Sequence, residues 1–279
     1  MEPFPLEDLP KRSAWAAYLL EPSREPPDEL TAYTGTARYA EIYDHLLQAH
    51  RNHPRPPAET IHRIRSREPD EPTLVSRAES LYLLEDEERL ERERTVVRRA
   101  LEPVLSGGET VLDLGCGWGW TLDAIASAFP DVHVRGGEYV PAGVAFAKRV
   151  IANHNPQIAV TEFDFHGDWD FLNHVDGDCV VFTKGALVTL EETEAVVDRL
   201  NRLAATGILT GGVHLEQVGP HPETTLGLLR RRYSTIRGYN DDALEQLQAA
   251  PSLEVTDVTY DVHGANPLHP LTRIRWRVR

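Results

Sequence analysis

Residues 109–120 read ETVLDLGCGWGW and place three glycines at alternate positions shortly after an aspartate. Gly115, Gly117 and Gly119 follow Asp113 at the end of a short apolar run. Glycine adopts backbone angles that are closed to other residues and lets a ligand approach the main chain closely. A helix that follows such a loop presents free amide groups to polar ligand atoms. The pattern therefore predicts a loop that cradles a small molecule.

Two familiar glycine loops do not fit these residues. A phosphate-binding loop of the Walker type ends in Gly-Lys-Ser or Gly-Lys-Thr, whereas this one continues through Trp118 to Trp120. A dinucleotide loop has G-x-G-x-x-G spacing, and its third glycine would fall at Trp120, where a bulky ring would crowd a pyrophosphate. A nicotinamide oxidoreductase is therefore disfavoured.

Acidic and aromatic residues lie at the ends of the predicted second and third strands, residues 132–140 and 157–165. A nucleoside cofactor needs a carboxylate for two ribose hydroxyl groups, typically at the end of the second strand, and Glu138 stands there. Tyr139 beside it is expected to pack against the adenine. The third strand ends in Phe163, Asp164 and Phe165.

The spacing D-x-G-x-G-x-G closely resembles the first motif of class I S-adenosylmethionine-dependent methyltransferases. The resemblance covers residues 108–218 and implies S-adenosyl-L-methionine as the cofactor. It assigns Asp164 to the adenine amino group, with an aromatic neighbour against the ring. The implied cofactor-binding residues are Asp113, Gly115, Cys116, Gly117, Glu138, Tyr139, Asp164, Phe165 and Thr183. The chain is also loosely similar to methyltransferases assigned to sugars or natural products.

Strands and helices alternate from residue 110 onward. Strands are predicted at 110–115, 132–140, 157–165, 178–185, 207–218, 253–262 and 271–279, with helices between most of them. This rhythm predicts an α/β fold with a doubly wound, mainly parallel sheet. The resemblance adds that the sheet has seven strands and ends in an antiparallel C-terminal hairpin.

The first hundred residues differ in composition and are rich in proline. We expect residues 1–105 to form a helical N-terminal cap or lid, with one long helix over residues 76–104 that carries Leu83 and Leu90 on its apolar stripe. Residues 106–279 are expected to form the Rossmann-like catalytic domain, with a helical insert at about 220–250.

Residues for acceptor binding and catalysis are harder to recognise, because methyl transfer mainly needs a positioned nucleophile and the exclusion of water. His214 and Glu216 share one face of the fifth strand, so His214 is our candidate general base and Glu216 its partner. A histidine inside a strand is more often a structural residue with its hydrogen bonds satisfied. The candidates for binding the acceptor are Lys184, Tyr39, Tyr43 and Tyr233.

Charge and composition restrict the partners. The formal net charge of −15 disfavours phosphate backbones and anionic lipid, so nucleic acid is an unlikely partner. Apolar stretches are too short for a membrane span, and the N-terminus lacks the features of a secretory signal, so we expect a cytoplasmic protein. The two cysteines, Cys116 and Cys179, make neither a zinc site nor a disulfide framework, and no metal is expected.

The sequence thus favours an enzyme that methylates an oxygen (or nitrogen) of a small molecule, sugar, natural product or peptide. Two alternatives remain: a non-catalytic S-adenosylmethionine-binding partner subunit, and a nucleic-acid methyltransferase. A homodimer is possible.

Overall fold

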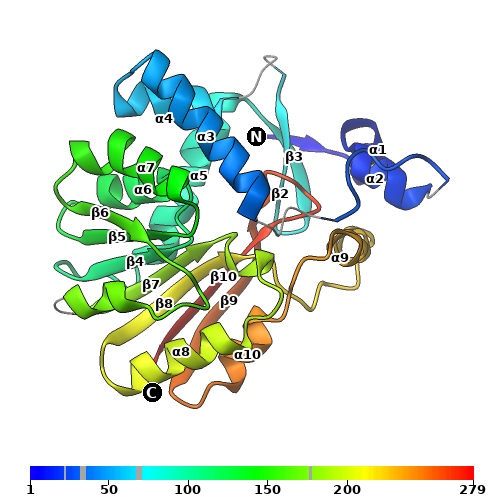
Figure 1. Ribbon diagram of the computed structural model, residues 1–279. Helices are drawn as coiled ribbons and strands as arrows, with labels where there is room; N and C mark the ends of the chain where they lie inside the picture. Colours follow the sequence, from blue (N-terminus) through cyan, green and yellow to red (C-terminus); the bar gives the residue numbers. More distant parts are fainter. Residues whose placement is uncertain (22, 32–35, 67–70, 176–177) are drawn as a thin grey trace.

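The computed structural model describes residues 1–21, 23–31, 36–66, 71–175 and 178–279. Figure 1 shows a central sheet with helices on both faces and a smaller layer of helices and strands beside its upper edge. Among the described residues, no helix is both long and apolar enough to cross a membrane.

Seven strands form the central sheet, in the order β6-β5-β4-β7-β8-β10-β9. Their bounds are β4 (Thr110–Leu114), β5 (His133–Glu138), β6 (Ile158–Glu162), β7 (Cys179–Lys184), β8 (Leu209–Glu216), β9 (Leu253–His263) and β10 (Leu271–Val278). The first five strands are parallel, and β10 is antiparallel to both β8 and β9. The predicted doubly wound sheet with an antiparallel C-terminal hairpin is confirmed.

Two helical layers cover the sheet. On one face lie α5 (Asp86–Leu101), α6 (Trp120–Ala128) and α7 (Pro141–Val150), whose apolar residues share a core with β4, β5 and β8. On the other lie α8 (Glu194–Ala205) and α10 (Ala243–Ala249), packed on β7, β9 and β10. The chain order of the parallel strands reverses between β4 and β7, so a crevice is expected at the carboxyl ends of these strands.

The N-terminal region contains the helices α1 (Leu9–Arg12), α2 (Ala14–Leu20), α3 (Thr36–Asn52) and α4 (Pro57–Arg65). Helix α3 packs along α7, while α2 packs on α9 (Thr225–Arg237), which precedes α10. Single 3-10 turns lie at Leu6–Asp8, Ala152–His154, Asp170–His174 and Leu187–Thr189.

The N-terminal region is not purely helical, and this corrects one expectation. Residues 76–104 do not form one helix, because β2 (Thr73–Arg77) and β3 (Ser80–Leu84) form a hairpin before α5 begins. With β1 (Glu2–Phe4) they make a separate antiparallel sheet in the order β1-β3-β2. Leu83 therefore belongs to a strand, and only the later part of the apolar stripe is helical. The domain limits at 105 and 106 remain a prediction.

Strand β10 carries arginines at alternate positions, and the β9–β10 hairpin supplies their partners. Ile274 and Trp276 are buried on the face covered by α8 and α10. On the opposite face Arg273 and Arg275 pair with Asp257, and Arg277 pairs with Glu254. The alternating charges are thus paired with acids of the neighbouring strand β9.

A buried ion-pair network joins the β2–β3 hairpin to the sheet. Asp261 on β9 accepts hydrogen bonds from Arg230 (2.8 Å) and Ser76 (2.7 Å). Arg230 also pairs with Glu79 in the hairpin turn. Arg230 and Asp261 are at most 2% exposed, so neither charge has water to replace its partner.

We predict that Asp261→Asn lowers the free energy of unfolding by about 3 kcal/mol, because it leaves a buried guanidinium without its main counter-charge. Asparagine keeps the size of the side chain and tolerates the left-handed backbone at this position (φ 49°). The matched control Asp257→Asn breaks partly exposed ion pairs and should cost at most about 1 kcal/mol. Urea unfolding of both variants measures the difference in stability. Equal losses of unfolding free energy would contradict the role of Asp261 as the main counter-charge of Arg230.

Candidate active site

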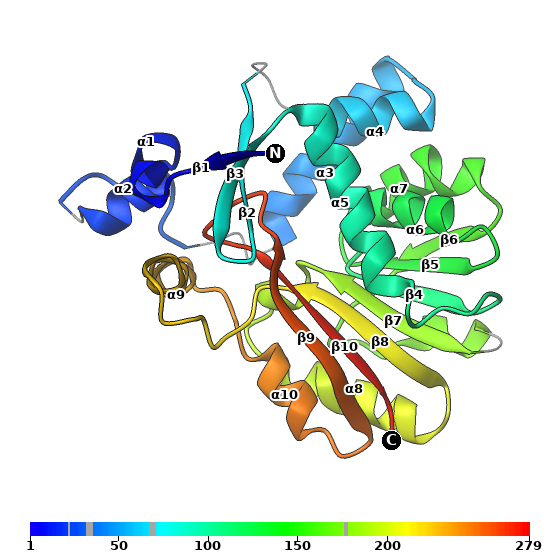
Figure 2. The same ribbon diagram turned by 180° about the vertical axis from the view of Figure 1, so that it is seen from behind.

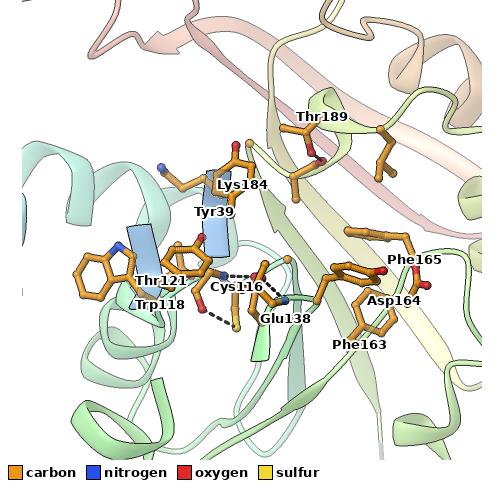
Figure 3. A pocket seen from close by; sticks show the side chains of 18 of the residues that line it. Tyr39, Cys116, Trp118, Thr121, Glu138, Phe163, Asp164, Phe165, Lys184 and Thr189 are labelled. Atoms are coloured by element: carbon orange, nitrogen blue, oxygen red, sulfur yellow. Dashed lines mark hydrogen bonds between the residues drawn. The ribbon is translucent and has the colours of Figure 1, made fainter. Parts of the chain in front are cut away.

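A cavity of about 490 Å³ opens at the carboxyl ends of the parallel strands, at the predicted crevice. Figure 3 shows side chains from the cap, the glycine loop and the ends of β5 and β7 converging on it. The described residues that line it are Tyr39, Tyr43, Arg65, Gly115, Cys116, Gly117, Trp118, Trp120, Thr121, Glu138, Tyr139, Val140, Phe163, Asp164, Phe165, His166, Lys184, Gly185, Ala186, Thr189, Leu190 and Glu191.

The glycine loop (residues 115–119) forms one wall of the cavity. Gly115 and Gly117 have φ angles of +77° and +57°, in the region that favours glycine. Space demands glycine as well, since a Cβ on Gly115 would lie 2.6 Å from the Cβ of Ala186 and one on Gly117 would lie 2.9 Å from the hydroxyl of Tyr43. The loop therefore offers bare main chain to a ligand.

Glu138 at the end of β5 forms the adjoining wall. Its Oε2 accepts a hydrogen bond from the Gly117 amide (2.9 Å) and its Oε1 accepts one from the Val140 amide (2.8 Å). Burial raises the pKa of this carboxyl, and the backbone donors oppose the rise. Each oxygen keeps further lone-pair capacity, so the carboxylate can accept hydrogen bonds from two neighbouring hydroxyl groups of a ligand.

Aromatic rings and an acid close the third side of the cavity. The rings of Phe163 and Phe165 meet edge to face, with centroids 5.0 Å apart. Between them in sequence, Asp164 lines the cavity, and its Oδ1 accepts a hydrogen bond from the His166 amide (2.9 Å). Tyr139 is 53% exposed and leaves a flat face available to a planar ligand.

Two cationic side chains and the indole ring of Trp120 lie at the remaining end of the cavity. Lys184 at the end of β7 has its Nζ 5.3 Å from the centroid of the Trp120 ring, and the guanidinium of Arg65 lies 4.6 Å from the same centroid. Burial lowers the pKa of Lys184 to about 8, and the charge of Arg65 acts in the same direction. Arg65 is also held by an ion pair with Glu93. This end of the cavity is therefore positively charged.

Cap residues complete the enclosure. Tyr39 and Tyr43 on α3 line the cavity, and Tyr43 lies over Gly143, where a Cβ would come within 2.8 Å of the tyrosine ring. Burial raises the pKa of both tyrosines, so their hydroxyl groups stay protonated. The cap thus contributes neutral hydrogen-bonding groups.

His214 does not reach the cavity. It is fully buried; its Nε2 accepts a hydrogen bond from the indole of Trp276 (2.8 Å), and its Nδ1 lies 2.9 Å from the hydroxyl oxygen of Thr183. Because Nε2 is an acceptor, Nδ1 carries the proton and donates it to Thr183. Burial lowers the pKa of His214 to about 3. Both nitrogens are engaged inside the core, which does not fit the predicted role of general base.

Glu216 has a structural task in the same region. It is fully buried and accepts hydrogen bonds from the amides of Ala186 (3.0 Å) and Val188 (3.3 Å). The Thr183 hydroxyl also donates to Glu216 and opposes the rise of its pKa that burial causes. A chain of hydrogen bonds thus runs from Trp276 through His214 and Thr183 to Glu216, which holds the segment 185–189 at the edge of the cavity. Glu216 and Thr183 are positioning residues in this geometry.

Two other expected site residues also lie elsewhere. Asp113 is 1% exposed and accepts a hydrogen bond from Thr121 behind the glycine loop, and burial raises its pKa to about 7. Tyr233 is buried against Trp15, with ring centroids 5.3 Å apart, where α9 packs on α2. Asp113 supports the loop from inside, and Tyr233 belongs to a separate core.

The sequence analysis missed several lining residues. Arg65 comes from the end of α4, and Thr189, Leu190 and Glu191 come from the segment after β7. Trp118 and Trp120 were noted only as departures from other glycine loops. Trp120 stands where a dinucleotide loop has its third glycine. Its large side chain indicates that side chains, and not main chain alone, form this wall of the cavity.

A family model described as a methyltransferase domain matches residues 111–207, which include β4 to β7 and most of the cavity wall. This segment is a methyltransferase domain. The match covers the glycine loop, Glu138, Asp164 and Lys184. The first part of the cap and the antiparallel hairpin lie outside it.

Solved structures share the fold. The mitomycin 7-O-methyltransferase MmcR is 17% identical, with a TM-score of 0.50; the match covers 70% of this chain and 56% of that one. The pyocyanin biosynthetic protein PhzM is 15% identical, with a TM-score of 0.48, and the match covers 66% of this chain and 55% of that one. An S-adenosylmethionine-dependent methyltransferase from Anabaena variabilis ATCC 29413 is 15% identical, with a TM-score of 0.48; the match covers 68% of this chain and 85% of that one.

This chain therefore spans little more than half the length of the first two structures. At 17% identity and a TM-score of 0.50, the likeness to MmcR shows the fold alone. A comparison with curated proteins found no matching relative.

We predict that His214→Gln flattens the dependence of stability on pH. The folded protein holds His214 neutral (pKa about 3), whereas the unfolded chain binds a proton below about 6.5, so this group makes the wild type lose about 1.4 kcal/mol per pH unit as the pH falls from about 6.5 towards 3. Glutamine can accept from Trp276 and donate to Thr183 without titrating.

Urea unfolding of both proteins between pH 8 and pH 5 tests this. The variant should be about 1–2 kcal/mol less stable at pH 8, and the gap should narrow as the pH falls. Other titrating groups are common to both proteins and cancel in the difference. Parallel pH profiles would show that His214 is not held neutral.

Proposed function

We propose that this protein transfers the methyl group of S-adenosyl-L-methionine to an oxygen atom of a small molecule. The observation that carries the proposal is one cavity with two chemically distinct ends. One end combines bare main chain, the Glu138 carboxylate and an acid flanked by aromatic rings. The other end holds Lys184 and Arg65 against Trp120.

The first end fits the cofactor. The glycine loop lines the cavity with main chain that carries no side chains at Gly115 and Gly117, and it is suited to the amino-acid tail. The two oxygens of Glu138 match the two ribose hydroxyl groups, while Asp164 and the neighbouring rings suit an adenine. When bound, the cofactor supplies an electrophilic methyl group on a sulfonium sulfur.

The second end favours an oxygen acceptor over an amine. A protonated amine would be repelled by the charges of Lys184 and Arg65, whereas a phenol, carboxylic acid or sugar hydroxyl gains from a nearby ammonium as negative charge develops on its oxygen. Lys184 has no hydrogen-bond or ion-pair partner among the described residues, so its charge is available to an acceptor. The histidine that the sequence suggested as a base is not needed in this arrangement.

The protein's own residues orient the reactants, supply charge and exclude water from the site. Segment 185–189, held by Glu216, and the ring of Trp120 shape the acceptor end, while Tyr39 and Tyr43 cover the cavity. Orientation of two reactants in such an enclosed site lowers a barrier by about 7–11 kcal/mol. Little further catalysis by side chains is required for so reactive a methyl donor.

The first test is cofactor binding by calorimetry. Glu138→Gln should weaken the binding of S-adenosylhomocysteine by about 10- to 100-fold, because hydrogen bonds to a charged group contribute about 1.5–3 kcal/mol. Glu162→Gln changes the same residue type on the adjacent strand, where Glu162 pairs in register with Glu138 but does not line the cavity, and should leave affinity within about threefold. Equal affinities in the two variants, or binding of NAD by the wild type, would overturn the cofactor assignment.

The second test separates acceptor from cofactor. Lys184→Met should leave affinity for S-adenosylhomocysteine within about threefold, yet reduce kcat/KM at least about 100-fold for any acceptor found among phenols, carboxylic acids and sugars. Lys148→Met, on the exposed side of α7, is the control and should behave as the wild type. Methyl transfer to amines with undiminished activity of Lys184→Met would exclude the proposed oxygen chemistry, and the absence of any transfer beside tight cofactor binding would favour a non-catalytic subunit.

A further inference from the structure

A second cavity, of about 560 Å³, lies on the α5 side of the sheet, away from the methyltransferase cavity. Its walls are α5, the turn of the β2–β3 hairpin and the upper ends of β8, β9 and β10. Figure 2 shows α5, the hairpin and these strands from this side. No residue lines both cavities. We call this second space the arginine cavity.

Three of its arginines are without a hydrogen-bonded or ion-paired acid in the described part of the chain. The guanidinium groups of Arg77, Arg92 and Arg99 line the arginine cavity, and none makes a hydrogen bond or ion pair with a described residue. The Nε of Arg92 is buried without a hydrogen-bond partner. Burial and the neighbouring charges of Arg77 and Arg99 lower the pKa of Arg92, and the charge of Glu88 only partly opposes this fall. Like charges are thus held close together in a chain whose net charge is strongly negative.

The acids around the arginine cavity do not neutralise this group. Glu88 is paired with the terminal amine of Met1 (3.1 Å), and Asp261 is paired with Arg230. Arg273, the fourth arginine of the lining, is already paired with Asp257. In the described part of the chain, Glu91 is the one lining carboxylate without an ion pair. Three unpaired guanidinium groups therefore face one unpaired carboxylate.

Apart from Thr95 and Thr259, the rest of the wall is apolar. It includes Val96 of α5, Leu215 of β8, and Tyr260 and Val262 of β9. A cavity of this volume is larger than an inorganic anion requires and lies in the range of small-molecule sites. The planar guanidinium fork matches the oxygens of phosphate in pairs and is the usual residue for recognising that group.

We propose that the arginine cavity binds a small phosphorylated organic molecule. Its phosphate lies among Arg77, Arg92 and Arg99, and its apolar part lies against Tyr260 and Val96. The ligand supplies the counter-charge that the protein lacks here. This site is independent of methyl transfer and stands even if the proposed function fails.

Calorimetry with phenyl phosphate as the probe, at constant ionic strength, tests the proposal. The paired variant Arg92→Gln/Arg99→Gln should bind it at least tenfold more weakly than the wild type. The charge-matched control Arg202→Gln/Arg231→Gln changes exposed arginines outside the cavity and should bind as the wild type does. Saturating S-adenosylhomocysteine should leave the affinity for phenyl phosphate unchanged, since the two cavities share no lining residue.

Further arms separate the features of the ligand. Inorganic phosphate and benzoate should each bind at least tenfold more weakly than phenyl phosphate, because one lacks the apolar part and the other the phosphate. Arg77→Gln alone, at the exposed end of β2, should also weaken binding and guards against a folding defect in the paired variant. Absence of saturable binding, equal binding by paired and control variants, or equal binding of benzoate would overturn the proposal.

Discussion

The site depends on one carboxylate fixed between two segments of backbone. Glu138 accepts hydrogen bonds from Gly117 in the loop after β4 and from Val140 at the start of α7. These contacts place a charged group of the second strand against the loop of the first. Such an arrangement is possible only if the neighbouring positions are small: Gly137 lies against the ring of Phe163, and Gly143 lies beneath Tyr43. Two glycines of the region, Gly137 and Gly143, thus serve packing around this carboxylate.

Much of the fold was predictable because its signals are local. Short apolar runs that end in glycine or an acid identified each parallel strand, and the loop spacing and Glu138 identified one end of the cavity. The β2–β3 hairpin was not recognised, because its apolar residues continue directly into the stripe of α5 and no glycine or proline marks the boundary between them.

Long-range pairing was the information that the sequence did not reveal. His214 looked like a base because its strand ends at the cavity, but the register of β8 and β10 sets Ile274 opposite His214 and Trp276 opposite Gly212. Gly212 has no side chain, and the indole of Trp276 lies where its Cβ would be. From this position the indole nitrogen of Trp276 reaches the imidazole of His214 on the neighbouring strand β8. Likewise Arg65 enters the site only through the folding of the cap, and no local spacing connects it with Trp120.

The hydrogen-bond chain from Trp276 to Glu216 connects the outer hairpin to the floor of the cavity. The indole orders the imidazole, the imidazole orders the hydroxyl of Thr183, and the carboxylate of Glu216 holds the amides of the segment 185–189. In the proposed function, a substitution at the indole, three strands away from the glycine loop, would therefore alter the shape offered to the acceptor while the contacts with the nucleoside stayed intact. Selectivity among acceptors can thus be tuned from a residue that no ligand ever touches.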